Sequence, residues 1–268
     1  MDAEFWNEIA GPKWVEQQEQ LDAIMAGHLA DLLAAADLRA GQVLVDVGCG
    51  CGVLSLEAAD RGCAVRGVDI SRPMLAHARR RADAAGLDID FAEADAQTHP
   101  LRSGSVDRVM SRFGVMFFSD PVAAFGNLRG WLAPGGSLHF LCWQPLDENP
   151  WMYKVLAVAK PWLEDSGSAD PRAPGPFSLG DTDHLRGVLS AAGFSDVQVA
   201  EVRRPMRVEG TPEEALAFYL ERGPIKAARA VSEEARAHVE ADLLALMRAE
   251  HDGEAVSMDG ACWLVTAR

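Results

Sequence analysis

The sequence has little positive charge and no long hydrophobic run. Lysine and arginine number 25 against 40 aspartates and glutamates, so the formal net charge is −15. A protein that binds phosphate backbones needs a basic face, so this balance argues against a nucleic-acid partner. No apolar run reaches the roughly 20 residues of a membrane-spanning helix, and the first residues lack the basic and apolar regions of a signal peptide. We therefore expect a cytoplasmic protein with no membrane span.

Cysteine is also scarce and irregularly spaced. The chain has five cysteines, an odd number, at scattered positions. Cys49 and Cys51 are too close together for the Cys-x-x-Cys pattern of a zinc or redox site. We expect reduced, mostly structural thiols and no bound metal.

Short apolar runs rich in branched residues alternate with helical segments along the chain. Such alternation predicts βαβ units and a parallel sheet with right-handed crossovers. The fold class is therefore α/β, a doubly wound, mostly parallel seven-stranded sheet whose last strand is antiparallel. The expected strands are 43–47, 64–69, 89–93, 106–110, 137–143, 197–202 and 261–266, with helices at 52–61, 71–85, 120–132 and 183–192.

Three other segments surround this pattern. Residues 1–40 are expected to form N-terminal helices that act as a lid, with Gly11-Pro12 breaking the first helix from the second. Residues 145–180 are rich in proline and predict an irregular insertion with a short helix. Residues 211–255 predict a helical insertion, which begins with Thr211 as a cap. We expect all of them to belong to a single domain, 1–268.

The most informative stretch is a glycine-rich turn, Asp46-Val47-Gly48-Cys49-Gly50-Cys51-Gly52, between an expected strand and helix. Glycines there let the backbone approach a ligand, and the helix N-terminus supplies free N–H donors. Val53 stands where a dinucleotide fingerprint needs glycine. A pyrophosphate would also be repelled by the Asp46 carboxylate, so a nicotinamide dehydrogenase is disfavoured.

Carboxylates also follow the second and third expected strands. Asp69, at the carboxyl edge of the sheet, could hold two ribose hydroxyls. The alternative is that Asp69 caps the next helix, although Ser71 can do this. Asp95, followed by Ala96, could accept the amino group of an adenine or be a simple loop residue. Three carboxylates at successive strand ends favour the ligand-binding interpretation.

These residues resemble the class I S-adenosylmethionine (SAM)-dependent methyltransferases, in the branch that includes the ubiquinone and menaquinone methyltransferases. The similarity covers residues 43–143, the expected SAM-binding core. The matching motifs are Asp46-x-Gly48-x-Gly50-x-Gly52, Gly67-Val68-Asp69-Ile70-Ser71, Met74-Leu75-Ala76-His77-Ala78, Glu93-Ala94-Asp95-Ala96 and Leu132-Ala133-Pro134-Gly135-Gly136.

The resemblance implies S-adenosyl-L-methionine as cofactor and a role for each matched residue. Gly48, Gly50 and Gly52 would face the methionine part, and Asp46 would lie under their loop. Asp69 would bind the ribose, and Asp95 with Ala96 would hold the adenine. The remaining expected cofactor contacts are Trp14, Ile70, Met74, Ser111 and Phe113.

The residues at the end of the fourth strand exclude several classes of methyl acceptor. Ser111-Arg112-Phe113-Gly114 differs from the Asn/Asp-Pro-Pro-Tyr/Phe of amino-group methylases and from the Pro-Cys of cytosine methylases. An aspartate that could begin a metal site is also missing there. We expect a small-molecule acceptor without metal, and the sequence makes no prediction of oligomeric state.

Methyl transfer from a sulfonium is a direct displacement, in which alignment and desolvation supply much of the acceleration. A base is needed only when the acceptor carries a proton. Arg112 and His99 are the candidate catalytic residues, and His28 is a further candidate base. Arg112 could instead pair with a carboxylate of cofactor or acceptor, or cap a helix.

The predicted function is methyl transfer to a small apolar or aromatic molecule under a two-part lid. The alternative is a SAM-fold protein that uses the cofactor for another group transfer or only senses it. The lid would carry large apolar side chains in both parts. They are Phe5, Trp6 and Trp14 near the N-terminus, and Trp151, Met152 and Tyr153 in the insertion.

Overall fold

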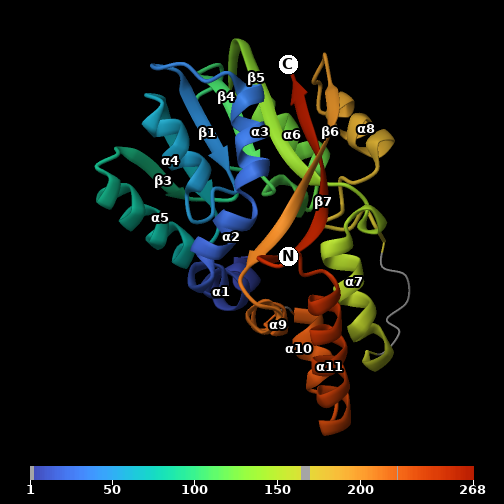
Figure 1. The fold of residues 1–268 in the computed structure, drawn as a ribbon. Coiled ribbons are helices and arrows are strands. Elements are labelled where there is room, and N and C mark those ends of the chain that lie inside the picture. The colour runs from blue at the N-terminus through green and yellow to red at the C-terminus, as the bar shows by residue number, and fades with distance from the viewer. Residues whose placement is uncertain (1–2, 164–169, 222) are drawn as a thin grey trace. The chain divides into compact units, whose positions relative to one another are not determined.

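A computed structural model describes residues 3–163, 170–221 and 223–268. Its centre is a seven-stranded sheet in the order β3-β2-β1-β4-β5-β7-β6 (Figure 1). Strands β1 to β5 pair in parallel and β7 pairs with β5 in antiparallel fashion, which confirms the expected doubly wound class. The strands are β1 (Val43–Val47), β2 (Ala64–Asp69), β3 (Ile89–Glu93), β4 (Val106–Arg112), β5 (Leu132–Trp143), β6 (Gln198–Glu209) and β7 (Ala255–Ala267).

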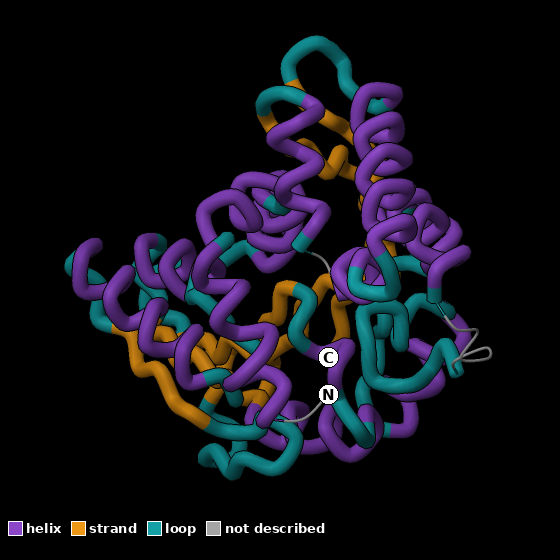
Figure 2. The backbone as a smooth tube through the Cα atoms, turned by 90° about the horizontal axis from the view of Figure 1, so that it is seen from below, coloured by secondary structure: helices purple, strands orange, loops and turns teal. Residues whose placement is uncertain are grey.

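The order of the strands decides where the helices lie. The chain runs from β1 to β2 to β3 in one direction, and from β4 to β5 in the other. Right-handed crossovers therefore put α4 (Val53–Asp60) and α5 (Arg72–Ala85) on one face, and α6 (Pro121–Trp131) on the opposite face. Helix α8 (Thr182–Ala191) packs against α6. Figure 2 shows helices lying over the strands of this sheet.

The N-terminal helices differ from the sequence prediction. A π-helical turn, η1 (Phe5–Ala10), continues directly into α1 (Gly11–Glu16), followed by α2 (Gln18–Ile24) and α3 (Ala26–Ala36). Gly11-Pro12 does not break the helix, because Gly11 has a helical φ of −61° and proline is tolerated in a first turn. The last helix ends before Asp37, which adopts a left-handed conformation.

Strand β5 begins five residues earlier than expected. The sequence Pro134-Gly135-Gly136 predicted a turn before the strand, but it forms an irregularity inside it. The register shifts there, since Val106 pairs with Leu132 and Arg108 pairs with Ser137. Such bulges insert extra residues on one strand while the pairing resumes beyond them.

Strands β6 and β7 are about twice as long as expected. Strand β6 contains Pro205 and several arginines, which break the alternating pattern that predicts a strand. It lies at the edge of the sheet, where proline and charge are tolerated because one side of the ladder is unpaired.

The chain divides into two compact units. The first holds residues 1–144, 171–202 and 262–268, and the second holds 145–170 and 203–261. Strands β6 and β7 run through both units, and the single-domain assignment stays a prediction. No described helix is long and apolar enough to cross a membrane.

The second unit is mainly helical. Helix α11 (Glu233–Ala249) packs against α7 (Pro150–Ala159), α9 (Pro212–Leu220) and α10 (Gly223–Arg229). Lys154 of α7 pairs with Glu250 at 2.5 Å. Thr211 caps α9 as expected, in a capping box with Glu214. Short turns η3 (Leu146–Glu148) and η4 (Lys160–Trp162) flank α7, which carries Trp151, Met152 and Tyr153.

The core of the first unit fills both faces of the sheet. Leu44, Val68, Val109 and Phe140, from four different strands, are fully buried. The five cysteines are buried and free, as expected of structural thiols. Burial raises the pKa of Cys51 to about 12, so its thiol stays protonated and unreactive at neutral pH.

Candidate functional site

The glycine-rich turn joins β1 to α4 at the carboxyl edge of the sheet. Gly48, Gly50 and Gly52 all have positive φ, between 55° and 84°, which glycine adopts without the clash of a side chain. A Cβ on Gly48 would lie 2.8 Å from the Cα of Gly114, and one on Gly50 would lie 2.8 Å from Cε of Met74. The loop is therefore held against the end of β4 and the start of α5 with no room for side chains.

Asp46 lies on β1, two residues before Gly48. Its side chain is almost completely buried, and its Oδ2 accepts a hydrogen bond of 2.6 Å from Ser55 Oγ. Burial raises the pKa of Asp46 to about 7, against the lowering effect of Ser55 and of the Arg112 charge. Sequence reasoning did not single out Ser55, although it follows Gly52 on the first turn of α4.

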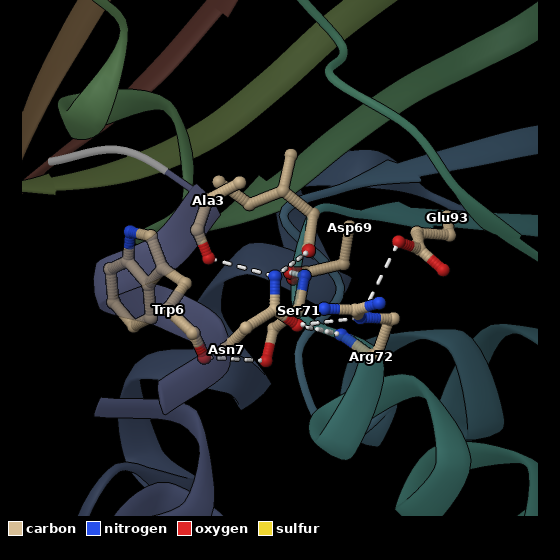
Figure 3. Close-up of polar contacts among 8 residues, drawn as sticks. Ala3, Trp6, Asn7, Asp69, Ser71, Arg72 and Glu93 are labelled. Carbon is tan, nitrogen blue, oxygen red and sulfur yellow. Dashed lines mark hydrogen bonds and ion pairs between the residues drawn. The ribbon is translucent and has the colours of Figure 1, made fainter. Parts of the chain in front are cut away.

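Asp69 ends β2 and connects two parts of the site (Figure 3). One carboxylate oxygen accepts the backbone N–H of Gly50 at 2.7 Å, and the other accepts that of Ser71 at 2.8 Å. Burial raises the pKa of Asp69. The expectation that Ser71 caps α5 with its side chain is wrong, because its Oγ instead donates to the carbonyl of Trp6 at 3.0 Å.

The N-terminal segment, residues 3–16, docks on this same corner. Asn7 Oδ1 accepts the backbone N–H of Arg72 at 2.8 Å, so Asn7 caps α5 from 65 residues away. Its Nδ2 donates to the carbonyl of Ile70 at 3.1 Å. Figure 3 shows Trp6 and Asn7 reaching Ser71 and Arg72 beside Asp69. No local sequence signal marks a cap supplied from so far away.

Asp95 and Ala96 lie in the loop after β3. Asp95 is exposed, and its Oδ1 accepts the backbone N–H of Gln97 at 2.9 Å, whereas Ala96 is buried. Gln97 joins this loop to the start of α6, because its Oε1 accepts N–H and O–H bonds from Ser119. His99 lies further along this loop. Its backbone N–H donates to the carbonyl of Asp95, and its own carbonyl accepts a hydrogen bond from Asn127.

At the end of β4, the predicted site residues Ser111 and Arg112 make contacts with different parts of the chain. Ser111 is fully buried, and its Oγ donates to the carbonyl of Val47 at 2.7 Å and accepts the N–H of Gly114 at 3.1 Å. Its hydroxyl thus fixes β4 to β1 below the loop. Arg112 forms an ion pair with Asp22 of α2 at 3.0 Å, and it caps none of the described helices.

Phe113 stacks on Trp143, the last residue of β5. The ring centroids are 4.1 Å apart and the planes differ by 9°. His28 of α3 lies edge-on to both rings, at 5.9 Å from Phe113 and 5.4 Å from Trp143. We call Phe113, Trp143 and His28 the aromatic cluster.

The remaining predicted contacts are Trp14, Ile70 and Met74. Trp14 is half-buried on α1, which packs against α5. Ile70 is half-buried beside Asp69, and Met74 is buried against Gly50. The structure thus gathers most predicted residues along the carboxyl ends of β1, β2 and β4, while Asp95 and His99 follow β3.

The residues present fit a ligand that carries both hydroxyls and a carboxylate. The loop glycines form a cradle that a Cβ would fill. Asp69 offers a carboxylate at the strand end, and in the described part of the chain Arg112 Nη1 is buried with no hydrogen-bond partner. This donor set suits the ribose and the methionine portion of SAM, which when bound supplies an electrophilic methyl group on a sulfonium.

Comparisons with known proteins agree with this geometry. Residues 44–136 match a family model described as a methyltransferase domain. The demethylmenaquinone methyltransferase of Thermus thermophilus is 42% identical over 169 residues, which cover 59% of this chain and 76% of that protein. The chain belongs to the class I SAM-dependent methyltransferases, in the branch that the motifs of residues 43–143 resemble. It is an enzyme whose cofactor is SAM.

Two further similarities have a narrower scope. The uncharacterized protein Rv1405c of Mycobacterium tuberculosis is 34% identical over 149 residues, 56% of this chain and 53% of that protein. The chain thus spans about half the length of that relative. The YcgJ protein of Bacillus subtilis has a TM-score of 0.59 at 17% identity, covering 89% of this chain and 96% of that one. At this identity the likeness shows the fold alone.

Proposed function

We propose that this methyltransferase transfers the methyl group of SAM to a small, largely apolar or aromatic acceptor beside the aromatic cluster. The observation that carries this proposal is the stacked pair of Phe113 and Trp143 at the carboxyl ends of β4 and β5. Ligands of open α/β sheets bind beyond these strand ends. Aromatic faces there favour a flat apolar acceptor, and they also attract a nearby sulfonium through cation–π interaction.

Phe113 is held in a conformation that a bulky side chain rarely adopts. Its φ is +64°, which costs of the order of 1–3 kcal/mol in a non-glycine residue. The next residue, Gly114, packs on Gly48 and is anchored to Ser111 Oγ. The strained turn thus sets the aromatic ring at a defined position next to the loop that faces the methionine part of the cofactor. Strain of this kind is typical of ligand sites.

The N-terminal segment supplies a cover within the same unit. The Trp6 ring lies edge-on to Phe117 of η2 (Val115–Phe117), with centroids 5.1 Å apart. The Trp6 carbonyl is bound to Ser71, next to the ribose-binding Asp69. A closed segment would exclude water, which competes as an acceptor and screens the charges of the displacement.

The role of the protein's own residues is then to bind the acceptor, orient it and exclude water from it. For an acceptor that must lose a proton, His28 is the better placed of the two candidate histidines, because its ring lies edge-on to the stacked Phe113 and Trp143. His99 follows β3, in the loop of the adenine-binding residues. We therefore propose His28, and not His99 or Arg112, as the base.

The test combines an acceptor screen with two variants. Phenols, naphthols and hydroquinones are compared with phosphorylated amino alcohols, and a gain of one methyl is read by mass spectrometry. Phe113→Leu is expected to raise KM for an aromatic acceptor by about tenfold or more, while the Kd for S-adenosylhomocysteine, which has no sulfonium charge, stays within about twofold. Phe194→Leu is the control. Phe194 is a buried residue that follows α8, so its substitution should lower the stability of the protein and leave KM unchanged.

Two results would contradict the proposal. One is methylation of the amino alcohols with no turnover of any aromatic acceptor. The other is a Phe113→Leu enzyme whose KM for its acceptor equals that of the Phe194→Leu control.

A further inference from the structure

Asp22 of α2 binds two arginines in a largely buried position. Its Oδ1 lies 3.0 Å from Nη2 of Arg112, and its Oδ2 lies 3.1 Å from Nη2 of Arg81. The side-chain exposures are 15% for Asp22, 11% for Arg112 and 24% for Arg81. Because solvent screens this group weakly, its geometry is better defined than that of a surface ion pair.

Further hydrogen bonds tie the group to the cofactor loop. Arg81 Nη1 donates to the carbonyl of Cys51, between Gly50 and Gly52, at 2.7 Å. Gln18, one helical turn before Asp22, donates to Asp22 Oδ2 at 2.6 Å, and its Oε1 lies 3.0 Å from His77 Nε2. Helix α2 is thereby linked to α5, to the glycine-rich turn and to the end of β4.

The charges of this group do not balance. Two guanidinium groups face one carboxylate at hydrogen-bond distance, which leaves a net charge of +1. Asp46 feels the Arg112 charge, but its pKa of about 7 means that it is only partly ionised at neutral pH. Arg112 Nη1 is buried and has no hydrogen-bond partner among residues 3–163, 170–221 and 223–268. A buried charged donor without a partner is costly, so a bound anion would stabilise it.

We propose that Arg112, held in place by Asp22, donates through Nη1 to the carboxylate of the methionine portion of SAM, and that Asp22 is a positioning residue for cofactor binding. The carboxylate is the one anionic group of SAM. The location fits as well, because Ser111, just before Arg112, binds the carbonyl of Val47, which precedes Gly48. The inference rests on the cofactor and is independent of the proposed acceptor.

The experiment measures binding alone. Calorimetry compares S-adenosylhomocysteine with its decarboxylated analogue, which keeps the adenosine and the amine. The wild-type enzyme is expected to bind S-adenosylhomocysteine at least about tenfold more tightly, since a hydrogen bond to a charged group contributes about that much. In Arg112→Met, binding of S-adenosylhomocysteine falls at least about tenfold, binding of the analogue stays within about twofold, and the discrimination disappears.

Asp22→Asn keeps the shape of the side chain but removes its charge. We expect S-adenosylhomocysteine to bind about three- to tenfold more weakly and the analogue to be unaffected. Arg66→Met is the matched control. Arg66 forms an ion pair with Asp90 on β2 and β3, and removing it should leave both affinities unchanged.

Equal weakening of both ligands in Arg112→Met would overturn the proposal, because it would show a purely structural arginine. A wild-type enzyme that binds the two ligands equally would overturn it as well. If Arg112→Met does not fold, Arg112→Lys serves instead, since it keeps the charge but lacks the second donor of the guanidinium fork. Discrimination between the ligands that remains at the wild-type level in this variant would also refute the assignment.

Discussion

Replacing Gly11 by alanine tests how the N-terminal segment is attached to the cofactor site. Gly11 lies in a helical conformation, so alanine is favoured there by backbone propensity, by about 1 kcal/mol. A Cβ would nevertheless collide with the carbonyl oxygen of Trp6 and with Ser71 Oγ, and would lie 3.2 Å from Cγ of Pro73. Two of these atoms form the Trp6–Ser71 hydrogen bond, so the segment must move away from the start of α5.

The magnitude follows from the contacts that such a movement breaks. They are the bond from Ser71 Oγ to Trp6 and the two bonds of Asn7, to Ile70 and Arg72. At about 0.5–1.5 kcal/mol each, less about 1 kcal/mol gained in helix propensity, docking of the segment should weaken by about 0.5–3.5 kcal/mol. Because the segment lies beside Asp69, we expect the affinity for SAM to fall at least about twofold.

The assay is hydrogen exchange of the amides of residues 3–16 together with calorimetric titration of SAM. The control is Gly126→Ala in α6, where a Cβ meets nothing within 4 Å and should stabilise the helix slightly. Faster exchange confined to residues 3–16 in Gly11→Ala, with a native sheet, is the expected result. Exchange rates and SAM affinity equal to those of Gly126→Ala would refute the reasoning.

Three more predictions concern single features of the site. Asp69→Ala should lower SAM affinity well over tenfold without unfolding the protein, because charge-assisted bonds to the ribose are lost; unchanged affinity by calorimetry would remove this assignment. Asp46 has a pKa raised from 3.8 to about 7, so between these values the unfolded chain binds fewer protons and stability falls as pH rises. Asp46→Asn should therefore raise Tm relative to wild type at pH 8 and not near pH 3.5, and a constant difference across this range would contradict the burial argument. Deleting residues 1–15 should abolish turnover and weaken SAM binding while the sheet stays intact by circular dichroism, and full turnover would show that the segment is not part of the site.

The sheet and the cofactor loop could be predicted because their signals are local. The first strand, Val43–Val47, is a short run of branched apolar residues, and the three glycines that follow it lie within five residues of one another. Parallel strands bring their carboxyl ends to one edge of the sheet, so the sequence alone predicts that Asp46 and Asp69 lie near each other. The hydrogen bond from the Gly50 N–H to the Asp69 carboxylate follows from this topology.

Predictions from the local sequence were wrong where a residue makes its contact with a distant part of the chain. Ser71 stands at the cap position of α5, but its hydroxyl binds Trp6 and the capping is done by Asn7. Pro134-Gly135-Gly136 has the composition of a turn, yet pairing on both sides of it continues as one strand. In each case the residue type is compatible with several local conformations, and a tertiary contact determines which of them is adopted.

The ion pairs of Asp22 with Arg81 and Arg112 join residues that are distant in sequence, but one feature of the sequence does point to them. Arg81 and Arg112 are far from Asp22 in sequence, and no spacing rule connects them. Helix α2, however, buries Leu21 and Ile24, and Gln18 and Asp22 lie one turn apart beside this apolar face. Polar residues at such positions must find partners or pay for burial, so they mark a place where another charged element approaches. Applied to the N-terminal helices, this reasoning would have directed attention to Asp22 and to the need for a buried cation, though not to which arginine supplies it.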